Sequence, residues 1–210
     1  MPLVPELRRA AIERALFPSD GRLTVEAAFH LVRDMPYERA SSPEPEAVIE
    51  EWRGTCSSKH RLLQAVLEEL GRPTMTMLAT HRFTPANSPW LPADLLEEAR
   101  REPVPDVHTF LRVEGEKEDW FTVDATWPRT ASALGLPVND AWIEGRNMRI
   151  AAEEDEVYDV PDDVDPAVAK ERLLERHAGP LGTPARERRE HFIVRLGEWL
   201  SSTTPGGGER

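Results

Sequence analysis

One stretch of the chain decides its fold, Gly54-Thr55-Cys56-Ser57-Ser58-Lys59-His60. Apolar residues follow it at three- and four-residue spacing, namely Leu62, Leu63, Val66, Leu67 and Leu70. This spacing predicts an amphipathic helix over residues 56–70, and Gly71 and Pro73 are typical of a helix end. With Thr55 as the N-cap, the only cysteine of the chain lies in the first helical turn.

The composition is that of an ordinary globular protein. The chain has 210 residues, of which 40% are hydrophobic and 30% charged. This length favours a single domain over residues 1–200. Its core is expected at about 45–150, with helical appendages at 1–40 and 166–200 and a disordered tail at 201–210.

Charge and cysteine content narrow the partners and the compartment. A net charge of -12 argues against nucleic acid, whose phosphates need a basic surface, and against an anionic membrane surface. One cysteine cannot close an internal disulfide, which favours a reducing compartment. Residues 1–17 lack the apolar segment of a signal peptide, and no stretch approaches the ~18 apolar residues of a membrane span. We therefore expect a cytoplasmic protein.

Hydrophobic periodicity and chain-breaking residues predict the other elements. Further helices are expected at residues 5–17, 24–35, 48–52, 93–101, 166–178 and 183–200. Strands are expected at residues 74–80, 107–113, 120–126 and 142–150.

Two segments between these elements admit more than one reading. Residues 81–106 hold five prolines around a short acidic helix; such an excursion is surface decoration or a binding segment. Residues 153–165 hold eight carboxylates. So many charged side chains predict a solvated loop. The alternative is a calcium site, but the spacing and central glycine of an EF-hand are absent.

Cys56 has the position of an activated nucleophile. Unpaired N–H groups and the positive end of the helix dipole lower a thiol pKa. A neighbouring imidazole lowers it further and can protonate a leaving group. The backbone N–H of Cys56 would also be free to bind an oxyanion. The alternative is a buried structural thiol, because free cysteines are among the most buried residues.

A predicted hairpin supplies partners for this cysteine. Strands 107–113 and 120–126 alternate apolar and polar side chains, and pairing their apolar faces puts His108 and Asp124 together on the other face. We expect these two residues directly opposite each other, across a three-residue loop at Gly115-Glu116-Lys117. Aspartate there would orient the imidazole, as in a Cys-His-Asp triad. The alternative is an ordinary surface pair.

Other residues are weaker candidates for the same site as Cys56, His108 and Asp124. Trp52, Thr55, His60 and Trp120 are candidate residues of a substrate pocket or an oxyanion hole, although tryptophans at such positions are more often part of the core. A zinc site built from Cys56, His60, His81 and His108 would match no standard ligand spacing. The sequence therefore predicts no metal and no cofactor.

The order of these motifs resembles the transglutaminase-like superfamily of papain-type cysteine enzymes. There a Gly-x-Cys opens a helix that ends at Leu-Gly, as Gly54-Thr55-Cys56 and Leu70-Gly71 do here. A histidine strand and an aromatic-x-x-Val-Asp-x-Thr strand follow, as His108 and the stretch from Trp120 to Thr126 do here. The match covers roughly residues 45–130, and the upstream motifs look like a bacterial branch. Ser57 departs from the aromatic residue usual after the nucleophile.

The resemblance implies an α+β fold, with the cysteine helix packed on an antiparallel sheet. It also implies acyl transfer through a thioester at Cys56, with His108 as acid and base and Asp124 as its orienting residue. The substrate would be a peptide, a protein or a small amide, and the enzyme a hydrolase or a transamidase. The alternative is a peptide-binding module of this type that has lost catalysis. The sequence leaves the oligomeric state open.

Overall fold

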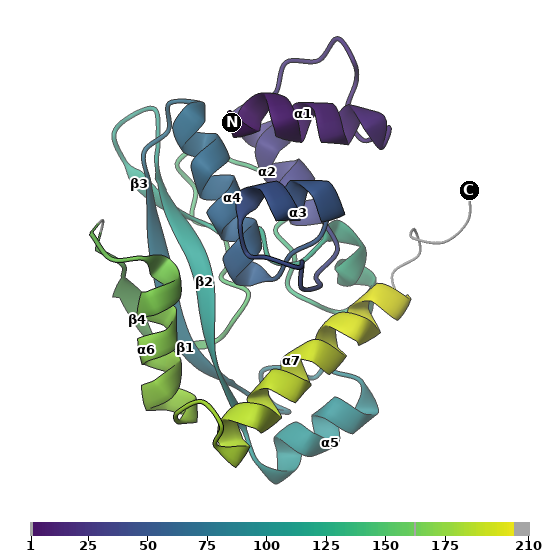
Figure 1. The fold of residues 1–210 in the computed structure, drawn as a ribbon, viewed down its shortest axis with the longest axis vertical. Coiled ribbons are helices and arrows are strands. Elements are labelled where there is room, and N and C mark those ends of the chain that lie inside the picture. Colours follow the sequence, from purple (N-terminus) through teal and green to yellow (C-terminus); the bar gives the residue numbers. More distant parts are fainter. Residues whose placement is uncertain (1, 162, 204–210) are drawn as a thin grey trace.

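The computed structural model describes residues 2–161 and 163–203 (Figure 1). Its helices are α1 (Leu3–Glu13), α2 (Val25–Asp34), α3 (Pro45–Glu51), α4 (Cys56–Glu69), α5 (Ala93–Arg101), the 3-10 helix η1 (Arg129–Leu134), α6 (Pro166–Ala178) and α7 (Pro184–Thr203). Its strands are β1 (Thr74–Phe83), β2 (Val104–Glu114), β3 (Trp120–Val123) and β4 (Glu154–Asp159). The predicted α+β class, with helices packed on an antiparallel sheet, is confirmed.

The four strands form one sheet in the order β3-β2-β1-β4. β1 and β2 pair along their whole length, from Thr74 opposite Val113 to Phe83 opposite Val104. β3 is much shorter and pairs only with the last four residues of β2, Leu111–Glu114. Within the described residues, the half of β2 that carries His108 therefore has no strand neighbour on the β3 side.

The main core lies between α4 and the sheet. Leu63 and Val66 of α4 are completely buried in one apolar cluster with Leu111 of β2. Phe29 of α2 and Ile49 of α3 join the same cluster, because the N-terminal helices pack around α4 (Figure 1). Each such side chain stabilises the fold by about 1.5–3 kcal/mol on burial, so α4 is fixed firmly in place.

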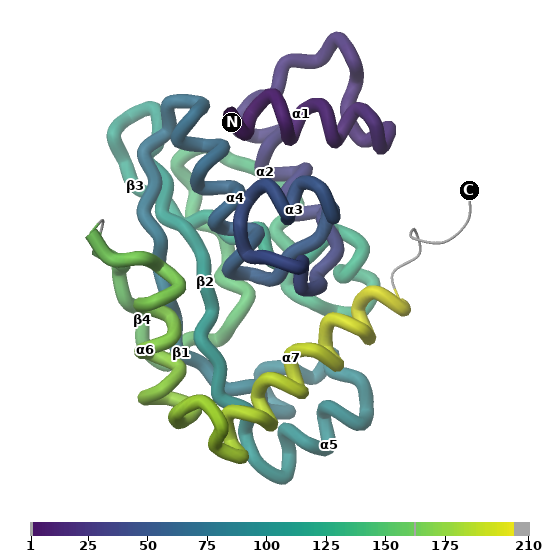
Figure 2. Tube along the Cα trace, viewed as in Figure 1, coloured from purple at the N-terminus to yellow at the C-terminus, as the bar shows by residue number. Residues whose placement is uncertain are grey.

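Two C-terminal helices complete the molecule. They lie in the lower half of the view in Figure 2, whereas α1 lies at its top. α6 covers β1 and β2 through Leu173 and Leu174, which share an apolar cluster with Val107. α7 buries Phe192 and Leu196 in a further cluster that includes Cys56. No helix in the described part of the chain is long and apolar enough to cross a membrane.

Each predicted helix is confirmed, most of them with shifted ends, but the strands need two corrections. Residues 142–150 are not a strand. Met148 N–H does donate to Thr122 O (2.9 Å), yet Thr122 N–H donates to the Asn147 side chain (2.8 Å), so a side chain replaces the ladder bond. The fourth strand is β4, inside the stretch predicted to be a solvated loop. Its exposed carboxylates hid an edge strand that pairs with Met77–His81 of β1.

The hairpin register was also wrong, by two residues. Leu111 faces Val123 and Glu114 faces Trp120, so the connection spans residues 115–119. Gly115 N–H closes it on Asp119 O (2.6 Å), and Glu118 takes a left-handed φ of 62°. A shift of two leaves every side chain on its predicted face.

The predicted disordered tail, residues 201–210, overlaps the end of α7. Ser201–Thr203 form the last turn of α7, and residues 204–210 lie outside the described residues.

Candidate active site

Cys56 is the first residue of α4 and is 4% exposed. Thr55 precedes it as the N-cap in an extended conformation, and its N–H donates to Ser58 Oγ (3.0 Å). The local sequence therefore starts the helix where predicted. The N–H of Cys56 lies in the first turn, where backbone N–H groups have no partner inside a helix. It is available to a developing oxyanion beside the sulfur.

His108 and Asp124 meet although they are not directly opposite. His108 Nε2 donates to Asp124 Oδ2 over 2.8 Å. Asp124 follows the last residue of β3, and its carboxylate also accepts from Thr126 N–H (2.9 Å) and Ala151 N–H (2.8 Å). Burial would raise the pKa of Asp124, but the charge and hydrogen bond of His108 hold it well below its ordinary value. The carboxylate is thus a fixed anion behind the imidazole.

The imidazole of His108 also interacts with the thiol of Cys56 closely enough that each shifts the pKa of the other. Because Nε2 is engaged by Asp124, Nδ1 is the nitrogen left for sulfur. Burial would raise the pKa of Cys56, but Lys170 and then His108 lower it to about 5. Burial would lower the pKa of His108, but Asp124 and Cys56 raise it to about 10. The three predicted residues therefore form one buried chain containing a thiolate and an imidazolium.

His60 connects the backbone at Cys56 to the backbone next to Asp124. It is completely buried, and its Nε2 accepts from Ala125 N–H (2.9 Å). The proton therefore sits on Nδ1, which donates to Cys56 O (2.7 Å). Burial lowers the pKa of His60 to about 4, so the ring is neutral. It holds the start of α4 against the residue that follows Asp124.

Lys59 is a second buried anchor, and sequence reasoning missed its role. Its ammonium donates to Arg33 O (2.7 Å), Met35 O (3.0 Å) and Thr126 O (2.8 Å). Burial lowers its pKa, but three carbonyl acceptors require the three protons that only the ammonium supplies. Lys59 thereby ties α4 to the end of α2 and to the segment after β3.

Lys170 of α6 is the residue that sequence reasoning missed most completely. Its Nζ lies 2.8 Å from Ser57 Oγ, 3.4 Å from Thr109 Oγ1 and 3.6 Å from Cys56 Sγ. The available signal was the scarcity of lysine. The chain has 26 basic residues but lysine only at positions 59, 117 and 170, and two of these lie at the site.

A second buried cluster adjoins His108. Arg189 of α7 donates from Nε to Asp106 Oδ1 (2.9 Å), and His81 Nε2 lies 3.6 Å from Asp106 Oδ2. The His81 and His108 rings are 6.4 Å apart between centroids. Burial would raise the pKa of Asp106, but Arg189 and His81 hold it well down. The cluster fastens α7 to β2 two residues before His108.

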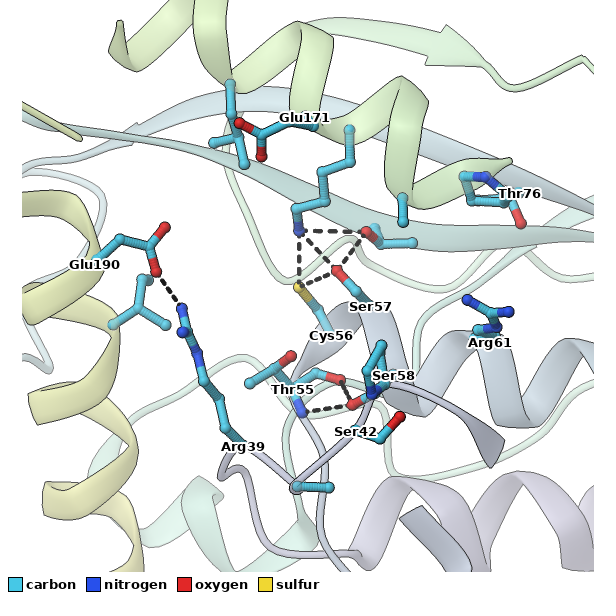
Figure 3. A pocket seen from close by; sticks show the side chains of 18 of the residues that line it. Arg39, Ser42, Thr55, Cys56, Ser57, Ser58, Arg61, Thr76, Glu171 and Glu190 are labelled. Carbon is cyan, nitrogen blue, oxygen red and sulfur yellow. Dashed lines mark hydrogen bonds and ion pairs between the residues drawn. The ribbon is translucent and has the colours of Figure 1, made fainter. Parts of the chain in front are cut away.

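A cavity of about 380 Å³ borders Cys56, and Figure 3 looks into it. Its walls come from the loop before α3, the first half of α4, the beginning of β1, the middle of β2, and the two C-terminal helices. Thr55 and Cys56, both labelled in Figure 3, line it, and so does Lys170, whose Nζ contacts the sulfur. None of the described residues that line it comes from the 81–106 excursion.

The other pocket candidates lie elsewhere. Trp52 ends α3 with a left-handed φ of 54° and packs under Arg14, 5.0 Å from its ring centroid. Trp120 pairs with Glu114, six residues along β2 from His108. His60 is sealed behind the site. Among the described residues that line the cavity, Thr55 is the one member of this predicted set.

The zinc alternative has no geometric support. In residues 2–161 and 163–203, no group of three or more His, Cys, Asp or Glu side chains is arranged to hold a metal ion. Both ring nitrogens of His60 are already committed to backbone groups.

Comparison with known proteins adds no assignment: the chain matches no family model and no curated protein. The transglutaminase-like resemblance therefore rests on the motifs and stays a prediction.

Proposed function

We propose that this protein transfers an acyl group from an amide or peptide through a thioester at Cys56, as a hydrolase or transamidase of transglutaminase-like type. The observation that supports the proposal most directly is the buried group of Cys56, His108 and Asp124, in which His108 hydrogen-bonds Asp124 (2.8 Å) and the charges of Cys56 and His108 favour each other. A structural thiol needs no imidazolium beside it, whereas a nucleophile does.

Acylation uses each member of the chain. The Cys56 thiolate attacks the carbonyl carbon of the donor, and the carbonyl oxygen becomes an oxyanion that the Cys56 N–H can bind. His108 then gives its proton to the leaving nitrogen, the C–N bond breaks, and an amine departs. Asp124 keeps the ring oriented throughout. The products are a thioester at Cys56 and a neutral His108.

Deacylation reverses the proton flow. Neutral His108 takes a proton from water or from an acceptor amine as that molecule attacks the thioester carbon. The C–S bond breaks, which restores the thiolate and the imidazolium. Water gives a carboxylic acid and an amine gives a new amide, so the acceptor decides between hydrolysis and transamidation.

The test is a screen with amide, peptide and thioester probes, read by turnover and by the intact mass of the protein. An acyl adduct is expected on Cys56, and because the chain has one cysteine, hydroxylamine release assigns it to sulfur. Cys56→Ala should abolish the adduct and turnover. His108→Ala should lower turnover by about 10²–10⁴, the usual contribution of a general acid–base.

Turnover that survives in Cys56→Ala would contradict the proposal. A folded wild-type protein that forms no adduct with any probe would favour the alternative, a peptide-binding module of this fold. We also propose a cytoplasmic location, because a lone reactive thiolate persists best in a reducing compartment.

A further inference from the structure

We propose that the cavity beside Cys56 accepts a small acyl group that carries a carboxylate, such as the acyl group of a dicarboxylic acid monoamide. This inference rests on the proposed function, because it concerns the acyl donor that Cys56 would attack. It depends on the charge of the cavity wall and on two cationic groups there.

The cavity has the opposite charge balance from the chain as a whole. The chain has a net charge of -12, yet the cavity is lined by five basic and two acidic side chains, namely Arg39, Arg61, Lys170, Arg186, Arg189, Glu171 and Glu190. A concave site with one sign of charge concentrates ligands of the other sign. Its volume of about 380 Å³ is at the small end for ligand sites, which span about 300–1,000 Å³.

The basic side chains differ in how their charge is compensated. Arg39 pairs with Glu190, and Arg189 pairs with Asp106 and Glu190. Lys170 has no carboxylate partner among the described residues. Its ammonium contacts two hydroxyl groups and the sulfur of Cys56 instead. The cavity cation without a carboxylate partner is therefore the one that contacts the reacting sulfur.

Arg186 gives a second, independent sign of a ligand. It is 4% exposed, and its other nitrogens contact Glu171 and Glu190. Its Nη1 is buried without a hydrogen-bond partner among the described residues, and so is Glu171 Oε1. Both residues line the cavity, and Figure 3 shows Glu171 near its upper wall. The unpaired N–H groups of Arg186 suit a carboxylate, and the unpaired oxygen of Glu171 suits an amide N–H. The proposed acyl donor carries both groups.

The chemistry itself adds a reason for an anionic acyl group. Before acylation, Lys170 faces a thiolate at 3.6 Å. The thioester is neutral, so acylation removes that negative charge and leaves the ammonium beside the acyl chain. A carboxylate on the acyl chain would replace the lost charge and stabilise the intermediate.

The test compares alkylation of Cys56 by iodoacetate and by iodoacetamide, which differ only in carboxylate against amide. Both react with the thiolate, so the ratio of their rates cancels the thiolate fraction. Intact mass reports the single site. We expect the ratio of the iodoacetate rate to the iodoacetamide rate to be at least about tenfold higher for Cys56 than for N-acetylcysteine amide. The imidazolium of His108 also attracts anions, so variants of Lys170 are needed to show which of the two cations causes a preference for iodoacetate.

Lys170→Met should lower the ratio several-fold, and Lys170→Arg, which keeps the charge, should preserve most of it. Lys117→Met is the matched control, because it removes the same charge from the β2–β3 connection and should leave the ratio unchanged. An unchanged ratio in Lys170→Met overturns the proposal. Failure of both reagents to reach Cys56 in the folded protein overturns it too.

This readout needs no turnover. Iodoacetate preference that depends on Lys170, in a protein that processes no amide, would support the anion site and contradict the proposed acyl transfer. The converse is tested with glutaryl anilide and its methyl ester. Turnover with no preference for the free acid would support acyl transfer and overturn the anion site.

Discussion

Cys56 and His108 each hold the other in its charged form, because the thiolate favours the imidazolium and the imidazolium favours the thiolate. The pKa of Cys56 falls to about 5 and that of His108 rises to about 10. Asp124 is the fixed charge that favours the imidazolium, since its Oδ2 lies 2.8 Å from Nε2 of the ring. Across neutral pH both groups are therefore charged.

Alkylation should report this pair directly. The rate of iodoacetamide labelling is expected to be nearly the same at pH 6 as at pH 8, because Cys56 is already a thiolate above about pH 5. An ordinary thiol, with a pKa of about 8.5, loses almost two orders of magnitude over that range. Asp124→Asn should shift the pH at which the labelling rate rises to a higher value. A wild-type rate that keeps climbing through pH 8 would contradict the ion pair.

Lys59 carries a stability prediction. Lys59→Met leaves three buried carbonyl groups without their donor, and each unsatisfied group costs about 1–3 kcal/mol. The free energy of unfolding, measured in urea, should fall by about 3 kcal/mol or more. Lys117→Met, on the exposed connection, should stay within about 0.5 kcal/mol of wild type. Equal effects of the two substitutions would show that Lys59 is not an anchor.

At the scale of elements, α6 is the piece that brings Lys170 to the site. Asp165 caps its N-terminus, accepting from Ala167 N–H (2.7 Å) and Val168 N–H (3.4 Å). Asp165→Ala should destabilise the protein by about 1 kcal/mol and speed amide hydrogen exchange in α6. If exchange in α4 rises as much as in α6, the two helices open together and the local interpretation fails.

The elements also show what the sequence could and could not predict. The three-and-four spacing after Cys56 predicted α4, because that periodicity reflects one buried face. The hairpin register missed by two residues, since the left-handed Glu118 lengthens the connection. His108 and Asp124 still meet despite that error, because a shift of two preserves faces. Lys170 was missed because α6 lies 114 residues from Cys56 and no local pattern links them.

For the whole molecule, the thiolate links stability to pH. The folded-state pKa of Cys56, about 5, lies below its unfolded value of about 8.5. The contribution of the Cys56 thiolate to the free energy of unfolding is therefore fully present above pH 8.5 and is lost as pH falls through 5.

The advantage of wild type over Cys56→Ala in free energy of unfolding should shrink from pH 8.5 to pH 5.5, by at most about 1.4 kcal/mol per pH unit. Urea titrations of both proteins at pH 5.5, 7 and 8.5 measure it. A difference that is independent of pH would mean that Cys56 carries no lowered pKa in the fold.

The wall built by α6 and α7 has a consequence for biosynthesis. A nascent chain that has emerged from the ribosome only as far as residue 165 already contains Cys56, His108 and Asp124, but neither Lys170 nor Arg189. The residues of the proposed triad are thus translated before α6 and α7, the two helices that supply Lys170 and Arg189 to the cavity wall. Premature termination would leave a thiol without its enclosure.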